Sequence, residues 1–155
     1  MLAIAFFQDA RAPCGLDIKT ELWLSLCRTY EIGHQLCIDR TNKQCFSVAE
    51  DADHTAETFA NWPELHAAYP DAKYVMIERQ APDPIVPTML QDYTHPEETG
   101  DLIYVVGPDN GGLQGLDAPG ADWVQIPVAD SRWGMWAIMA ATEVMGDRWR
   151  RGNNG

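Results

Sequence analysis

The sequence is poor in basic side chains and lacks two patterns that identify common enzyme classes. Only 11 Lys and Arg stand against 23 Asp and Glu over 155 residues, which gives a formal net charge of −12. Such a surface repels phosphate backbones unless the basic residues gather on one face. No G-x-S-x-G or G-x-G-x-x-G pattern occurs, which disfavours a small α/β hydrolase or a flavodoxin-like domain with a different cofactor.

Membrane, disulfide and metal signals are also missing. No apolar run approaches the roughly 18 residues that a membrane-spanning helix needs, and no basic residue precedes the short apolar run at 2–7. The four cysteines (Cys14, Cys27, Cys37, Cys45) show no C-x-x-C spacing, and the four histidines are scattered. We therefore expect a cytoplasmic protein with reduced structural thiols, no membrane segment and no metal site.

Apolar runs alternate with amphipathic stretches along the chain. We expect strands at residues 2–7, 35–39, 72–78, 102–106 and 123–128, and helices at residues 17–27, 62–69, 88–92 and 132–149, with a frayed tail from residue 148. Strands that alternate with helices, and are continuously apolar, indicate a mainly parallel sheet covered by helices on both faces. The sequence thus predicts a single α/β domain over residues 1–155.

A glycine-rich loop follows the strand expected at residues 102–106. Gly107, Gly111 and Gly112 let the backbone turn sharply and approach a ligand closely. A loop at the carboxyl end of a parallel strand lies where ligands of α/β proteins usually bind. By itself the pattern is equally typical of a plain tight turn, so its meaning depends on the segments that follow.

Three sequence motifs occur in order in the C-terminal third. They are Gly107-Pro108-Asp109-Asn110-Gly111-Gly112-Leu113, Ile126-Pro127-Val128 and Asp130-Ser131-Arg132. They resemble the G-P-E-x-x-G-L, I-P-M and D-S-R motifs of the SPOUT RNA methyltransferases, most closely those of the small tRNA wobble-nucleotide 2′-O-methyltransferases, with Asp109 in place of Glu. The opening strand and the Leu26-Cys27 pair also look like that family, and residues 40–70 are poorly covered.

The resemblance implies a C-terminal trefoil knot in residues of about 101–150, a homodimer, and S-adenosylmethionine as cofactor. The cofactor-binding residues it implies are Val106, Gly107, Pro108, Asp109, Gly112, Leu113, Ile126, Val128, Ser131 and Met135. An apolar stripe on the last helix suits the dimer interface, but ordinary core packing explains it nearly as well. Its members are Trp133, Trp136, Ile138, Met139 and Met145.

The resemblance breaks at the residues expected to perform the reaction. The family's first motif has an arginine that is thought to help activate the ribose hydroxyl, and here Thr20 or Ser25 aligns with it. Arg28 is the nearest arginine, although a position at the end of a helix also suits a solvated side chain favoured by the helix dipole. The candidate catalytic residues are Arg28, Ser131 and Arg132.

Two functions remain open from the sequence. The first is an S-adenosylmethionine-dependent RNA methyltransferase that acts on a tRNA ribose 2′-hydroxyl or on a related target. Its candidate RNA contacts are Arg11, Lys19, Arg28, Arg40, Arg132, Arg148, Arg150 and Arg151. The alternative is a non-catalytic dimer of the same fold that binds S-adenosylmethionine or a protein partner, and the acidic net charge and the missing arginine motivate it.

Overall fold

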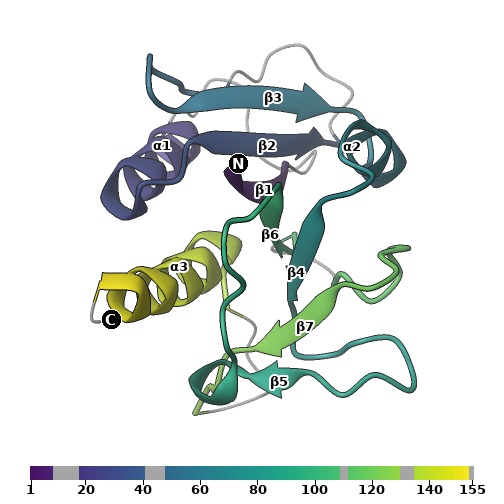
Figure 1. The fold of residues 1–155 in the computed structure, drawn as a ribbon. Coiled ribbons are helices and arrows are strands. Elements are labelled where there is room, and N and C mark those ends of the chain that lie inside the picture. Colours follow the sequence, from purple (N-terminus) through teal and green to yellow (C-terminus); the bar gives the residue numbers. More distant parts are fainter. Residues whose placement is uncertain (9–17, 41–47, 109–111, 130–134, 154–155) are drawn as a thin grey trace.

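The computed structural model describes residues 1–8, 18–40, 48–108, 112–129 and 135–153, and these form one seven-stranded sheet with helices on both faces (Figure 1). The strands are β1 (Leu2–Gln8), β2 (His34–Asp39), β3 (Thr55–Phe59), β4 (Lys73–Ile77), β5 (Thr88–Met89), β6 (Leu102–Val106) and β7 (Asp122–Gln125). The helices are α1 (Ile18–Tyr30), α2 (Trp62–Ala68) and α3 (Ala137–Asn153), with a short 3₁₀ helix, η1 (Leu90–Asp92). The strand order is β3-β2-β1-β6-β4-β7-β5, and all of these neighbours pair in parallel.

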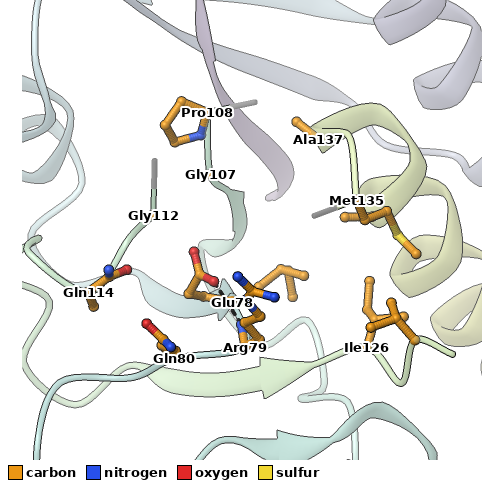
Figure 2. Close-up of a pocket in the computed structure, with 13 residues that line it drawn as sticks. Glu78, Arg79, Gln80, Gly107, Pro108, Gly112, Gln114, Ile126, Met135 and Ala137 are labelled. Atoms are coloured by element: carbon orange, nitrogen blue, oxygen red, sulfur yellow. Dashed lines mark hydrogen bonds between the residues drawn. The ribbon is translucent and has the colours of Figure 1, made fainter. Parts of the chain in front are cut away.

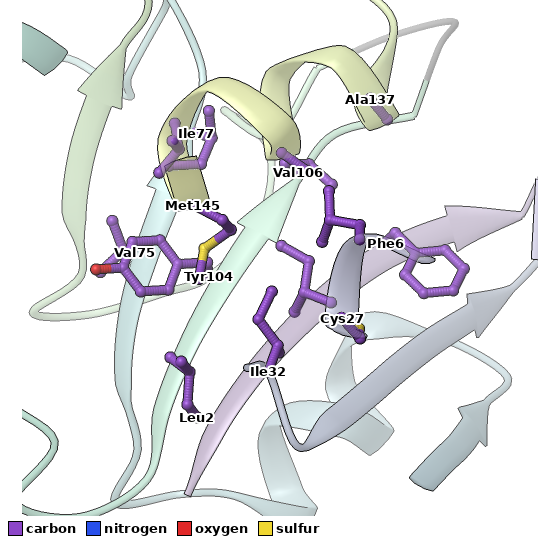
Figure 3. Close-up of a cluster of buried hydrophobic side chains, with 14 of the residues drawn as sticks. Leu2, Phe6, Cys27, Ile32, Val75, Ile77, Tyr104, Val106, Ala137 and Met145 are labelled. Carbon is purple, nitrogen blue, oxygen red and sulfur yellow. The ribbon is translucent and has the colours of Figure 1, made fainter. Parts of the chain in front are cut away.

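The central strands are buried on both faces, which explains their continuous apolar sequences. Ile4 in β1, Tyr104 in β6 and Val75 in β4 are fully buried. Figure 3 shows the cluster that these strands form with α1 and α3. A second cluster packs α2, through Trp62 and Leu65, against the other face. The predicted parallel sheet with helices on both faces is therefore confirmed.

Helix α2 begins where the sequence predicts. The Asn61 side chain accepts a hydrogen bond from the Glu64 N–H at 2.9 Å, and Glu64 reaches back to the Ala60 N–H at 3.1 Å. The first bond satisfies an amide that the first turn of a helix leaves without a partner, and the second holds the residue before the N-cap. Pro63 lies in the same turn, where its missing N–H costs nothing.

Two strands escape the sequence prediction, and both lie at the edges of the sheet. Strand β3 is half-exposed and alternates polar with apolar residues, so it lacks the long apolar run of the central strands. Strand β5 has two residues, and the helix predicted at 88–92 is wrong at its start because Thr88 and Met89 pair with β7. Only residues 90–92 are helical, as η1.

Helix α3 extends further than the sequence predicts. It begins at Ala137 rather than at residue 132 and continues to Asn153, so the predicted fraying from residue 148 is wrong. Arg151 explains the extension, since its guanidinium donates to the carbonyl oxygens of Leu90 at 3.3 Å and Tyr93 at 3.0 Å. These bonds attach the last turn to the loop that leads into β6.

The trefoil knot expected in residues 101–150 depends on how two loops pass each other. Those loops include residues 109–111 and 130–134, which lie outside the described residues. The described helices include none that is long and apolar enough to cross a membrane.

A buried polar network joins α3 to the sheet. The His95 side chain is 7% exposed, and its Nδ1 and Nε2 atoms lie 2.8 Å from the Tyr104 hydroxyl and 3.0 Å from Asp147 Oδ2. Arg151 Nε also contacts Asp147, at 2.9 Å, and Arg148 adds a second positive charge nearby. Burial lowers the pKa of His95 below its usual value, and the hydrogen bond to Asp147 offsets this only in part.

We expect His95 to make folding stability depend on pH. In the unfolded chain a histidine takes up its proton near pH 6.5, whereas in the folded protein His95 does so at lower pH. The unfolded state therefore binds more protons between these two values, and the free energy of unfolding decreases as the pH falls below about 6.5. Urea unfolding at about pH 7 and pH 5 should show a smaller decrease for His95→Asn than for the wild type. Equal decreases in the two proteins would contradict the prediction.

Candidate functional site

A cavity of about 380 Å³ opens at the carboxyl ends of β4, β6 and β7, beside the first turn of α3 (Figure 2). The described residues that line it are Ile77, Glu78, Arg79, Gln80, Gly107, Pro108, Gly112, Gln114, Ile126, Val128, Met135, Ala137 and Ala140. Parallel strands have their carboxyl ends on the same side of the sheet, so the ends of three strands meet there, and residues 135–140 at the start of α3 add a fourth stretch of the sequence.

The glycine-rich loop passes close to the side chain that follows β4. A Cβ atom added at Gly107 would lie 3.4 Å from Leu113 Cγ and 3.6 Å from Glu78 Oε2. At Gly112 the added atom would lie 3.0 Å from the same carboxylate oxygen. A side chain at Gly107 would therefore compete with Leu113 and Glu78 for space, and at Gly112 the Gln114 side chain already occupies the place that a Cβ would take.

Six of the ten predicted cofactor-binding residues line this cavity. They are Gly107, Pro108, Gly112, Ile126, Val128 and Met135. Val106 and Leu113 are fully buried at the end of β6 and beneath the loop. Asp109 and Ser131 lie outside the described residues, as does the predicted catalytic residue Arg132. The structure thus brings together residues from the first two motifs and the residue shortly after the third.

Polar lining residues that the sequence analysis missed are Glu78, Arg79, Gln80 and Gln114, and Glu78 is the acidic one among them. Its N–H donates to the Val124 carbonyl at 2.9 Å, which continues the pairing of β4 with β7. Its Oε2 atom accepts from the Leu113 N–H at 3.1 Å, and its Oε1 atom accepts from the Arg79 N–H at 2.9 Å. The carboxylate therefore connects the end of β4 to the glycine-rich loop. The available signal was the polar triplet 78–80 directly after an apolar strand.

Arg28 lies far from the cavity of its own chain. It occupies the last turn of α1, which leads into the amino end of β2, and its Nε donates to Asp51 Oδ2 at 2.8 Å. Hydrogen bonds from His54 and from Arg28 hold the pKa of Asp51 well below its usual range. The cavity lies at the carboxyl ends of strands that span roughly 20 Å. Among the lining residues that the structure describes, Arg79 is the one arginine.

The other basic residues predicted to contact RNA whose side chains the structure describes do not line the cavity. Arg40 follows β2 at the carboxyl edge, and its guanidinium lies 5.1 Å from the centre of the Phe7 ring. Arg148 and Arg151 form ion pairs with acidic side chains of the same chain. They lie 11 or more residues after Ala137, the first residue of α3, which lines the cavity. Eleven residues of α-helix correspond to about 16 Å. The side chains of Arg11, Lys19 and Arg132 are outside the described part.

The apolar stripe of α3 divides into two sets. Met145 is 1% exposed and belongs to the core, so core packing is the correct interpretation there. Trp136 and Met139 are 67% and 53% exposed and lie next to the cavity-lining residues Ala137 and Ala140. Trp133 is outside the described residues. The exposed part of the stripe therefore borders the mouth of the cavity.

Cys27 and Cys37 are free thiols in the described core. Burial raises the pKa of both thiols to about 12, and nearby carboxylates add to the effect. Each side chain is thus held as a neutral thiol, which makes it a poor nucleophile and a poor metal ligand.

The sequence matches no protein-family model and no curated protein. Similar solved structures share its topology. A Bacillus anthracis protein assigned as an RNA methyltransferase superposes with a TM-score of 0.68 at 11% identity, over 99% of this chain and 95% of that one. The SpoU methyltransferase AviRb from Streptomyces viridochromogenes, solved in complex with AdoMet, gives a TM-score of 0.63 at 14% identity, over 99% of this chain and 58% of that one. The chain has the SpoU methyltransferase fold.

Another similar structure comes from work on the 2-OH methylation of C/U34 on tRNA. It has a TM-score of 0.62 at 12% identity and covers 99% of this chain and 97% of its own. A TrmH-family protein from Porphyromonas gingivalis is matched over only 59% of its length, so this chain spans about three fifths of some proteins with the SpoU fold. The predicted resemblance to SPOUT methyltransferases is thus confirmed at the level of the fold.

Proposed function

We propose that the chain is an S-adenosylmethionine-dependent RNA methyltransferase of the SPOUT type, which acts in the cytoplasm on a tRNA ribose 2′-hydroxyl or a related RNA nucleotide. The observation that carries the proposal is the cavity at the carboxyl ends of β4, β6 and β7. Residues of the G-P-D-N-G-G-L and I-P-V segments line it together, on a fold shared with SpoU methyltransferases. The proposal includes a knotted arrangement of residues 101–150.

The lining residues fit this cofactor. A volume of about 380 Å³ lies within the range of small-molecule sites, roughly 300–1,000 Å³. Gly107 and Gly112 let the loop pass close to Glu78, whose carboxylate lines the same cavity. Ile126 and Met135 offer apolar contact to a purine, while Glu78 offers hydrogen-bond acceptors. S-adenosylmethionine, when bound, supplies a methyl group that its sulfonium centre has already activated.

The protein's part in the reaction is mainly alignment and removal of a proton. Methyl transfer requires the nucleophile in line with the methyl group, and a ribose hydroxyl needs a base or a positive neighbour that lowers its pKa. Arg79 lines the cavity and can provide that positive charge. Ser131 and Arg132 remain candidates because Val128 and Met135, on either side of them in the chain, both line the cavity. Arg28 is not included among the candidate catalytic residues, because it pairs with Asp51 near the amino ends of the strands, away from the cavity.

Two measurements test the proposed function. Calorimetry on the purified protein should show binding of S-adenosylmethionine. Incubation with labelled S-adenosylmethionine and bulk tRNA should then place the label in 2′-O-methylated nucleosides, which mass spectrometry identifies after digestion. Absence of binding would refute the methyltransferase assignment, and binding without transfer to any RNA pool would favour a non-catalytic protein of the same fold.

The proposal also includes a homodimer that uses the exposed end of α3. Trp136, which directly precedes α3, and Met139 are large exposed apolar side chains three residues apart, and contiguous exposed apolar surface is a feature of interaction sites. A second copy packed there would also cover the mouth of the cavity. Trp136→Glu should convert the dimer to a monomer in analytical ultracentrifugation, because the interface would then bury an unpaired charge.

The matched control is Trp149→Glu at the other end of α3, where the tryptophan is 41% exposed and far from the cavity. This variant should sediment as the wild type does. A monomeric wild-type protein, or equal effects of the two substitutions, would contradict an interface at Trp136.

A further inference from the structure

Glu78 is the acidic side chain that lines the cavity among the described residues, and no motif of the sequence accounts for it. We propose that its carboxylate accepts hydrogen bonds from the ribose 2′- and 3′-hydroxyls of the nucleoside that the cavity binds. The inference rests on the proposed function, because it takes the ligand to be S-adenosylmethionine. It assigns the ribose recognition of that ligand to one side chain.

The position of Glu78 follows from the strand that precedes it. Its N–H is held by the Val124 carbonyl at 2.9 Å, so the backbone here continues the sheet and does not swing freely. The side chain then extends across the carboxyl end of β6 towards Gly107 and Gly112, as Figure 2 shows. A residue fixed in this way can present its carboxylate at one place in the cavity.

The carboxylate has capacity left for a ligand. Two oxygens offer about four acceptor positions. Within the described residues the Leu113 N–H uses one of them on Oε2, at 3.1 Å, and the Arg79 N–H uses one on Oε1, at 2.9 Å. Counting the donors of the described residues alone, each oxygen keeps one position for a further donor. A ribose diol provides two O–H donors on adjacent carbon atoms, which suits two oxygens of one carboxylate.

The surroundings separate a polar side of the cavity from an apolar side. Glu78, Gln80 and Gln114 come from the end of β4 and from the glycine-rich loop, whereas Ile126 and Met135 lie towards α3 (Figure 2). A nucleoside matches this division, because its sugar carries hydroxyl groups and the flat faces of its base make apolar contacts. An acidic residue next to a glycine-rich loop at the end of a parallel strand is a recurrent way to hold ribose hydroxyls in α/β proteins.

A purely structural role for Glu78 makes a different prediction. If the carboxylate only fixes the loop through Leu113, its removal lowers the affinity for every ligand of the cavity by the same factor. If the carboxylate binds the diol, its removal lowers the affinity only for ligands that carry the diol. The two roles are separated by a double-mutant cycle between the protein and the ribose.

The experiment measures competition against S-adenosylmethionine by S-adenosylhomocysteine and by its 2′-deoxy and 3′-deoxy forms. For the wild type, each deoxy form should bind about tenfold more weakly, the value typical of a lost hydrogen bond to a charged group. Glu78→Ala should bind S-adenosylhomocysteine at least tenfold more weakly and should no longer distinguish it from the deoxy forms. Glu78→Gln keeps the size of the side chain but loses its charge, and should show most of the same loss.

The control is Glu97→Gln, the same chemical change at an exposed position outside the cavity, which should preserve the wild-type pattern. Circular dichroism and the melting temperature establish whether each variant is folded. If Glu78→Ala does not fold, Glu78→Gln alone provides the test. If the Glu78 variants bind all three ligands more weakly by the same factor, or bind them as the wild type does, the proposed role of Glu78 is wrong. The proposed function still stands in that case, provided that the wild type binds S-adenosylmethionine. No binding by the wild type would refute the proposed function itself.

Discussion

Gly107→Trp should reduce the affinity for S-adenosylmethionine by at least about 100-fold and leave the fold intact. The added Cβ would lie 3.4 Å from Leu113 Cγ and 3.6 Å from Glu78 Oε2, so the indole ring must extend into the cavity or displace both neighbours. A ligand present at 100 times its dissociation constant stabilises a protein by about 2.7 kcal/mol. The wild type should therefore melt at a higher temperature with S-adenosylmethionine than without it, and the variant should not.

Gly115→Trp is the matched control for this prediction. A Cβ at Gly115 meets no atom within 4 Å, and the residue is exposed three positions after Gly112. This variant should bind S-adenosylmethionine and show the wild-type shift in melting temperature. If both tryptophan variants bind normally, the cofactor occupies another part of the molecule.

Phe6→Ala should lower the free energy of unfolding by about 3–5 kcal/mol, the usual loss for a buried phenylalanine. Phe6 is fully buried in β1 and stacks on Trp23 of α1, with ring centroids 4.1 Å apart and planes inclined by 6°. The truncation leaves a cavity and removes the main aromatic contact that holds α1 on the sheet. Urea denaturation followed by circular dichroism measures the change.

The neighbouring residue provides the control for this stability prediction. Phe7 points to the opposite face of β1, is only half-buried, and lies beneath the Arg40 guanidinium. Phe7→Ala should cost clearly less than Phe6→Ala, because it leaves no closed cavity. Equal losses would show that the stack on Trp23 adds nothing beyond the removal of a ring.

Sequence patterns succeeded where one element has one environment along its whole length. The run Leu102–Val106 is apolar at every position because both of its faces are covered, and this predicted a central parallel strand. The same pattern did not predict the edge strands β3 and β5, because β3 is half-exposed and β5 has only two residues. Their existence depends on the neighbouring strand that pairs with them, which periodicity does not reveal.

The sequence by itself predicted the glycine-rich loop as a ligand site, the motifs that accompany it and the parallel sheet, because each depends on residues close together in the chain. Only the tertiary structure decided which side chains face that loop. Glu78 accepts a hydrogen bond from Leu113, which lies 35 positions away in the sequence, whereas Arg28 pairs with Asp51 near the amino ends of the strands. The physical reason is that parallel strands gather their carboxyl ends at one edge, so the composition of the cavity depends on strand order, and strand order is not a local property.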